Sequence, residues 1–339
     1  RNINNPLLLF NDVPVKFVND HKHLGLTFTN TGKWHEHINN IISSSKSILG
    51  LMRKMKFSVN RQTINQLYTS FLRPLIEYAS VVWDGCSQYE KENLEKIQNE
   101  AARIITGLTR SVSLEKLYTE TCWLKLSERR QYQKLIYMFK IINGMTPDYL
   151  NILLPDTVNN NVNNYNLRNA NDLTTIVRRT ELFSNSFIPS SITSWNNLSP
   201  EVKNLNTISQ FKNALKRTIF KTNQIPKHFL LGNRFLSVMH ARLRNGCSNL
   251  NNDLFKNHLQ VFKHCSCGFH TEDTDHFLFQ CPLYTNARIQ MFRSLQQFHP
   301  LNKNLLLFGS NNLNDNDNIT VLNAVHAYIK STNRFSIIN

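Results

Sequence analysis

Apolar residues recur at three- and four-residue spacing through most of the chain, which predicts a mainly helical protein. Pro74 should bend or end one of these helices, because proline lacks the backbone N–H that helical bonding needs. Gly144 and Pro147 should close another. The apolar stripes are most simply core packing, and we assign them no chemistry. The spacing predicts helices over 38–55, 64–75, 94–108, 135–142, 211–219 and 322–329, and a short one capped by Ser113.

The first 29 residues follow a different pattern, which predicts β-strands. Residues 7–10 are apolar, Asn11 and Asp12 can form a turn, and apolar residues alternate over 13–18. A third strand is expected over 24–28. So few strands do not make an independent sheet, so we expect them to complete one whose other strands lie upstream of Arg1. A first residue other than Met fits a fragment of a longer polypeptide.

Polar, Asn-rich stretches at 159–171 and 311–318 interrupt the helical pattern and predict loops or linkers. Together with the charge and cysteine patterns below, they divide the chain into consecutive segments. We expect strands over 1–29, a helical bundle over 30–150, a linker and connection over 151–201, a basic helical region over 202–263, a Cys/His knuckle over 264–285 and a helical tail over 286–339.

The chain is strongly basic, with 39 Lys and Arg against 23 Asp and Glu and a formal charge of +16. No acid occurs from His37 to Ile76, and eleven bases but only Asp253 as an acid occur from Val202 to Lys263. Charge of this density indicates a polyanionic partner, for which phosphate backbones are the usual candidate. A basic surface without a partner is the alternative. We expect RNA or DNA contacts at Arg53, Lys54, Lys56, Arg61, Lys212, Lys216, Arg217, Lys221, Arg242 and Arg244.

A composition of 41% hydrophobic residues is that of a globular protein. No apolar run approaches the length of about 18 residues that a membrane helix needs, and no signal-peptide pattern opens the sequence. We therefore expect a protein of the cytoplasm or nucleus that is not secreted and has no membrane partner.

Three of the six cysteines fall within seventeen residues, in the stretch CSCGFHTEDTDHFLFQC at 265–281. Zinc favours four thiolate and imidazole ligands in a tetrahedral arrangement, and a fully ligated zinc is structural. The spacing predicts a structural Zn²⁺ bound by Cys265, Cys267, His276 and Cys281. The alternatives are a reduced thiol cluster beside a surface histidine, or a ligand set that includes His264, His270 or Cys247.

Catalysis is not expected from this chain alone. Nucleotidyl transfer needs clustered carboxylates that hold Mg²⁺, and the sequence has no adjacent Asp-Asp pair and no Tyr/Phe-x-Asp-Asp strand. It also lacks a glycine-rich phosphate loop, a nucleophile elbow and an H-E-x-x-H pair. We therefore predict no polymerase, nuclease or RNase H activity from this chain alone, and no catalytic residue in it.

Several stretches resemble the C-terminal region of reverse transcriptases of jockey-like non-LTR retrotransposons. HKHLGLTFTNTGKWHEHI at 21–38 resembles the segment that leaves the polymerase palm in that family, and LYTSFLRPLIEYASVVWDG at 67–85 resembles its thumb signature. CSCGFHTEDTDHFLFQCPLY at 265–284 resembles its terminal C-x-C-G element. Further matching blocks lie at 124–150, 186–202 and 242–255, in the family's order.

The resemblance implies that the parent protein is an RNA-directed DNA polymerase, with its catalytic aspartates and their Mg²⁺ upstream of Arg1. This chain would then be a mainly α-helical thumb-like bundle preceded by strands of an incomplete palm and followed by a CCHC zinc knuckle. It would grip the template–primer duplex beside the upstream polymerase domain. The alternative is a degenerate or standalone helical scaffold for protein interactions, without a nucleic-acid function.

Overall fold

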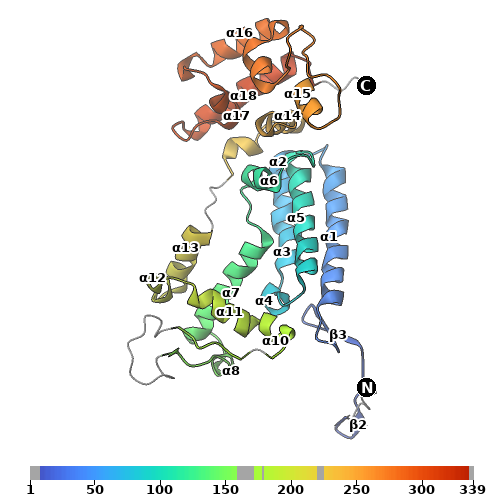
Figure 1. The fold of residues 1–339 in the computed structure, drawn as a ribbon, viewed down its shortest axis with the longest axis vertical. Helices are drawn as coiled ribbons and strands as arrows, with labels where there is room; N and C mark the ends of the chain where they lie inside the picture. Colours follow the sequence, from blue (N-terminus) through green and yellow to red (C-terminus); the bar gives the residue numbers. More distant parts are fainter. Residues whose placement is uncertain (1–7, 159–171, 178, 220–224, 336–339) are drawn as a thin grey trace. The chain divides into compact units, whose positions relative to one another are not determined.

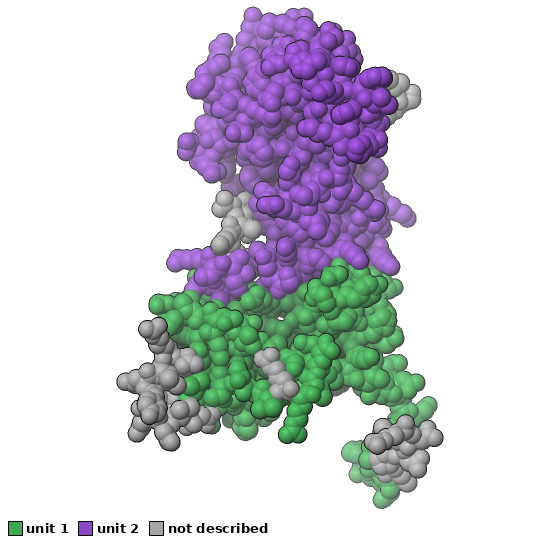
Figure 2. All heavy atoms as spheres, viewed as in Figure 1, with its two compact units in different colours: residues 1–44, 78–93, 130–213 green, residues 45–77, 94–129, 214–339 purple. Residues whose placement is uncertain are grey.

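The computed structural model describes residues 8–158, 172–177, 179–219 and 225–335. Its fold is mainly helical, as the apolar spacing predicts, with two small antiparallel sheets of two strands each (Figure 1). The chain divides into two compact units (Figure 2). Unit 1 holds residues 1–44, 78–93 and 130–213, and unit 2 holds residues 45–77, 94–129 and 214–339.

The N-terminal strands form two separate hairpins. In the first, β1 (Leu9–Phe10) pairs with β2 (Val13–Pro14) across the predicted turn at Asn11 and Asp12, which both have positive φ angles. In the second, β3 (Asp20–His23) pairs with β4 (Leu26–Thr29). The third strand expected over 24–28 therefore begins two residues later, at Leu26, and its partner β3 was not expected. Leu24 and Gly25 form the turn between the two strands, with φ angles of 46° and 82°.

Four long helices contribute residues to both units, and the other helices of unit 1 are short. The long helices are α1 (His35–Met55), α5 (Gln88–Thr106), α7 (Leu126–Ile142) and α13 (Ile208–Ile219). The short ones are α4 (Ser80–Trp83), α8 (Asp148–Asn151), α10 (Glu181–Asn185), α11 (Phe187–Asn196) and α12 (Pro200–Lys203).

Stacked aromatic rings hold the helices of unit 1 together. Phe139 of α7 stacks on Phe211 of α13 with ring centroids 4.4 Å apart, and Trp195 of α11 packs against the same ring. Nearby, the Asp84 carboxylate accepts a 2.7 Å hydrogen bond from Arg130 and pairs with Lys134. Although burial acts to raise it, Lys134 and the other cations hold the pKa of Asp84 below its ordinary value. These ion pairs neutralise buried charges inside unit 1.

Unit 2 is built from two sets of helices. The first set comprises α2 (Arg61–Leu67), a π-helical turn η1 (Tyr68–Leu72), α3 (Arg73–Glu77) and α6 (Leu114–Thr121), together with parts of α1 and α5. The second set comprises η2 (Lys227–Leu230), α14 (Arg234–Asn245), α15 (Asn251–Lys256), η3 (His276–Gln280), η4 (Pro282–Tyr284), α16 (Thr285–Ser294), η5 (Gln296–Phe298), α17 (Lys303–Phe308) and α18 (Asp315–Ser331).

Pro74 widens its helix instead of ending it. Proline cannot donate to the carbonyl four residues earlier, and its ring crowds that carbonyl. The turn before it is a π-helix over Tyr68–Leu72, and α3 continues to Glu77. The helix stops only after that, where Ala79 adopts a left-handed conformation with φ 49°.

One hydrophobic core joins the second set of helices in unit 2, which is coloured from tan to red in Figure 1. Phe277 and Leu278 are fully buried in it, and both come from the short η3 turn. Tyr328 of α18 packs edge-on against Phe277 and donates a hydrogen bond to its carbonyl. The core therefore holds this turn in place, and the metal-ligand candidate His276 is its first residue.

Candidate metal centre

A tight turn places Cys265 and Cys267 on the same side of their loop. The Gly268 N–H donates to the Cys265 carbonyl at 3.0 Å, and the Cys265 N–H donates to the Phe269 carbonyl at 2.9 Å. Gly268 has a φ of +93°, which residues with a side chain rarely adopt. The glycine in the C-x-C-G sequence therefore allows the turn that points both thiols inward.

The other two side chains come from a single wide helical turn. The Cys281 N–H donates to the His276 carbonyl at 2.8 Å, a five-residue step that belongs to a π-helix. The turn is capped at its start, where Asp273 accepts a 2.8 Å hydrogen bond from the His276 N–H. In a regular α-helix, residues five apart point about 140° away from each other. The wider turn brings His276 and Cys281 toward the same side.

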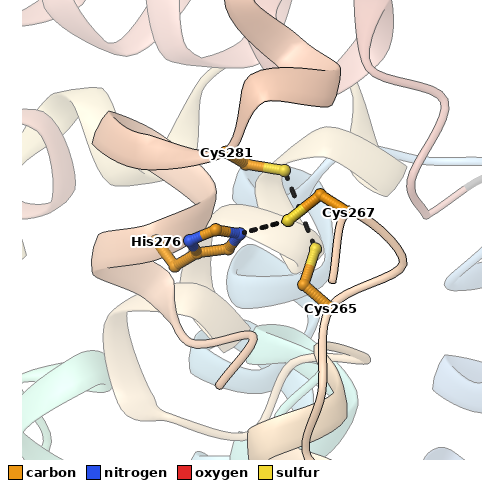
Figure 3. A group of neighbouring side chains, drawn as sticks. All are labelled: Cys265, Cys267, His276 and Cys281. Atoms are coloured by element: carbon orange, nitrogen blue, oxygen red, sulfur yellow. Dashed lines mark hydrogen bonds between the residues drawn. The ribbon is translucent and has the colours of Figure 1, made fainter. Parts of the chain in front are cut away.

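The four side chains converge on one point (Figure 3). The Sγ atoms of Cys265 and Cys281 lie 3.7 Å apart, and the Sγ of Cys267 lies 3.3 Å from the Nε2 of His276. All four atoms lie within 4.8 Å of one another. Cys265, His276 and Cys281 are buried and Cys267 is half-buried. This group could hold a metal ion, with the ligand set expected from the sequence.

Neighbouring side chains fix the orientation of the ligands. The Phe269 ring lies parallel to the His276 imidazole, with centroids 4.4 Å apart and an angle of 3° between the planes. The buried Glu272 carboxylate lies beside Cys265 and accepts 2.7 and 2.6 Å hydrogen bonds from Arg334 near the end of the chain. Glu272 also accepts from the backbone N–H of Asn251 at 2.8 Å. The loop is thus tied to α15 and to the residues after α18.

Without a cation, these thiols do not all ionise readily. Burial raises the pKa of Cys265 to about 12 and also raises the pKa of Cys281. Although burial opposes it, the Phe269 N–H and the adjacent thiols lower the pKa of Cys267. A bound metal would stabilise the thiolates, because the thiolate is the ligand form, and binding would release protons.

The rival ligands from the sequence lie outside this cluster. His264 and His270 have exposed side chains and are not among the four converging groups. Cys247 is buried elsewhere, in a small core with Ala102 and Leu117. Within the residues that the structure describes, the four predicted ligands form the one Cys/His group with metal-binding geometry.

The predicted nucleic-acid contacts fall into two classes, of which the first is exposed or half-buried. Arg53 and Lys54 lie exposed in the last turn of α1, where Arg53 also pairs with Glu100 at 3.1 Å. Lys216 and Arg217 are exposed at the end of α13, and Lys56 and Lys212 are half-buried. Lys221 lies outside the described residues.

Arg61 and Arg244 belong to a second, buried class, and their assignment as phosphate contacts needs correction. Their side chains are 1% and 2% exposed. Arg61 donates to the Glu120 carboxylate at 2.7 Å and to its backbone carbonyl at 2.9 Å, and Arg244 donates to both carboxylate oxygens. Arg244 also stacks on Phe229. Guanidinium groups enclosed in this way cannot reach a phosphate backbone in the folded protein.

A pocket in unit 2 is lined by basic residues, only some of which the sequence patterns indicated. It has a volume of about 660 Å³, and Arg53, Lys56 and Arg242 line it. Arg103, Arg110 and Arg234 line it too, although none of the three was among the contacts expected from the sequence. Their grouping depends on the fold, since Arg110 and Arg234 lie more than a hundred residues apart.

No described helix is both long enough and apolar enough to cross a membrane. Comparisons with models of protein families, with curated proteins and with solved structures find no match for this chain.

Proposed function

We propose that this chain binds nucleic acid, as the thumb-like and zinc-knuckle part of a non-LTR retrotransposon reverse transcriptase whose catalytic aspartates lie upstream. The observation that carries the proposal is a set of bases without acidic partners. Lys54, Lys56, Lys212, Lys216 and Arg217 form no salt bridge with any residue that the structure describes. Cations kept free of carboxylates in this way are available to phosphates.

We further propose that Cys265, Cys267, His276 and Cys281 hold a structural Zn²⁺. Tetrahedral zinc with bonds of about 2.3 Å to sulfur and about 2.0 Å to nitrogen separates two sulfur ligands by about 3.8 Å, and a sulfur from a nitrogen by about 3.5 Å. The distances of 3.7 Å and 3.3 Å in this cluster agree with those values. Three thiols and one imidazole complete the coordination, so the ion would stabilise the knuckle and leave no position for a substrate.

The salt dependence of binding tests the nucleic-acid proposal. Each phosphate contact contributes about 0.9 to the slope of log K against log salt on a B-form duplex. Replacing Lys212, Lys216 and Arg217 by Gln should therefore reduce the slope by about two to three units, nearly independently of base sequence. Replacing Arg53, Lys54 and Lys56 should have a similar effect.

A matched control replaces three other exposed lysines, Lys22, Lys116 and Lys125, by Gln, so that the net charge changes equally. Affinities for a template–primer duplex would be measured by fluorescence anisotropy between about 50 and 200 mM salt, the range over which phosphate contacts dominate. The proposal would be contradicted if the slope stayed unchanged in both test variants or fell by the same amount in the control variant. These bases would then be solvated at the surface without specific contacts to the phosphates.

A further inference from the structure

The basic pocket of unit 2 lies among three helices. Residues from the C-terminal parts of α1 and α5 and from along α14 line it, and its volume of about 660 Å³ is within the range of about 300–1,000 Å³ typical of ligand sites. Six of its lining residues are bases and one, Glu100, is an acid. The bases are Arg53, Lys56, Arg103, Arg110, Arg234 and Arg242.

Part of this charge has a structural role. Arg234 donates to the carbonyls of Ile104 and Ile105, and the Nε of Arg242 donates to the Gly107 carbonyl at 2.8 Å. These are the carbonyls that the C-terminal end of α5 leaves without helical partners. The two arginines thus cap that helix, which explains why they lie beside it.

The capping hydrogen bonds leave other N–H donors and the positive charge of these arginines available. A guanidinium has five N–H donors, and for Arg242 only the Nε has a hydrogen-bond partner among the described residues. Burial, together with the charges of Arg61 and Arg242, lowers the pKa of Arg234 to about 10. Glu100 lies 3.1 Å from Arg53 and 3.9 Å from Arg110, and it is shared between them. The pocket therefore has an excess of positive charge that an anion would neutralise.

Exposed aromatic rings lie among these bases. Phe57 is 80% exposed, although phenylalanine is usually buried, and the Lys56 ammonium lies 4.7 Å from its ring centroid. Phe235 of α14 also lines the pocket and is 39% exposed. Cations beside exposed aromatic faces are typical of sites that hold phosphates and stack unpaired bases.

We infer that this pocket binds an unpaired strand of nucleic acid, with phosphates on Arg110 and Arg242 and a base stacked on Phe57. The inference rests on the proposed function and names the strand state that this site selects. A duplex is a convex cylinder whose bases are already stacked on each other, so it cannot fill a concave pocket or offer a free base to Phe57. Duplex binding instead depends on exposed bases that do not line the pocket, such as Lys54, Lys216 and Arg217.

The test compares two ligands on the full chain and on exposed-site variants. The double variant Phe57→Ala, Arg110→Gln changes two side chains that are 80% and 89% exposed, so the fold should be retained. Phe71→Ala, Lys116→Gln is the matched control, because it removes an aromatic ring that is 62% exposed and an exposed base outside the pocket. Anisotropy would give the affinity of each protein for a single-stranded oligonucleotide and for the blunt duplex of the same sequence.

We expect the pocket variant to lose at least about fivefold in affinity for the single strand, the lower end of what one stacked base contributes. Its salt slope on the single strand should fall by about 0.7, the value for one phosphate contact. Its duplex affinity should change less than twofold, as should both affinities of the control. Equal losses on both ligands, or no loss on the single strand, would overturn the inference while leaving the proposed function in place. A wild-type chain that binds neither ligand would overturn both.

Discussion

At Glu120, two guanidinium groups meet one carboxylate inside unit 2. Although burial alone would raise it, the charges of Arg244 and Arg61 hold the pKa of Glu120 at about 2. The group is therefore ionised at every pH at which the protein is expected to work. A buried charge is tolerated only when it is paired, so the three residues depend on each other.

Replacing Glu120 by Gln should destabilise the protein by about 3–5 kcal/mol, because it leaves two buried cations unpaired. Glu115→Gln is the control, since Glu115 is exposed on the same helix and should change stability by about 0.5 kcal/mol or less. The free energy of unfolding in denaturant measures both. The folded pKa of Glu120 is depressed, so its contribution is present above about pH 4.5 and is lost as the pH falls toward about 2. A Glu120 variant as stable as the control would contradict this account.

The sequence could not reveal which arginines are buried. Arg61 and Arg244 lie in basic stretches and look like their exposed neighbours Lys54 and Arg217. Their partner is 59 residues from one and 124 residues from the other, so no local pattern links them. The candidate metal ligands were easier to predict, because three of them are cysteines that fall within seventeen residues and thiols cluster for few reasons.

Among the elements, the long helices such as α1, α5 and α18 followed from the apolar spacing, the short helices α10, α11 and α12 lie in the stretch expected to be a linker, and the strands followed only in part. A helical stripe is repeated over several turns, as in α1 and α5, so one misread residue changes little. The strands have four residues or fewer, so too few residues alternate to fix their ends, and Leu24, expected to begin a strand, lies in a turn. The π-helical turn η3 had no sequence signal, although it orients two of the candidate ligands.

The knuckle element should lose its metal in a Cys281→Ser variant, because one of four ligands is removed. We expect about one zinc per wild-type chain and strongly reduced zinc in the variant, measured by metal analysis after gel filtration. Cys122→Ser is the control, since Cys122 is half-buried and lies outside the cluster. Zinc retained in full by the Cys281 variant would mean that another group completes the site.

Chelation should unfold the knuckle loop and spare the helices that do not depend on it. The Cys265–Cys267 turn has exposed neighbours such as Val261 and Phe262, which are 75% and 64% exposed, and little core of its own. Hydrogen exchange after treatment with a chelator should therefore rise over 259–275, while α5 stays protected. Equal exchange with and without chelator would show that the loop folds without an ion.

Across the whole molecule, neutral histidines buried in unit 2 should make stability sensitive to mild acid. Burial lowers the pKa of His326 to about 4 and places that of His240 well below its ordinary value, and nearby Arg244 lowers both further. The two rings lie 5.4 Å apart. Because the unfolded state binds these protons first, their stabilising contribution is present above about pH 6.5 and is lost as the pH falls toward about 4.

His326 alone should account for about 3 kcal/mol of this loss, about 2 kcal/mol of it above about pH 5, since one pKa unit corresponds to about 1.4 kcal/mol. The free energy of unfolding would be measured between about pH 7.5 and pH 5, above the window in which Glu120 titrates. His326→Gln should weaken the dependence of the unfolding free energy on pH, and His21→Gln, at an exposed position, should leave that dependence unchanged. A wild-type stability that rises as the pH falls over this range would contradict the assignment.

The ion group at Glu120 also bears on how the protein is made. Arg61 and Glu120 leave the ribosome long before Arg244, which follows Glu120 by 124 residues. At about 5–20 residues per second, that interval lasts roughly 6–25 s. Until then, the nascent helices around Glu120 lack one of the two guanidinium groups that enclose its carboxylate, so their packing can be completed only after α14 has been synthesised. A ribosome that stalled within this interval would therefore carry a nascent chain in which Glu120 is still incompletely enclosed.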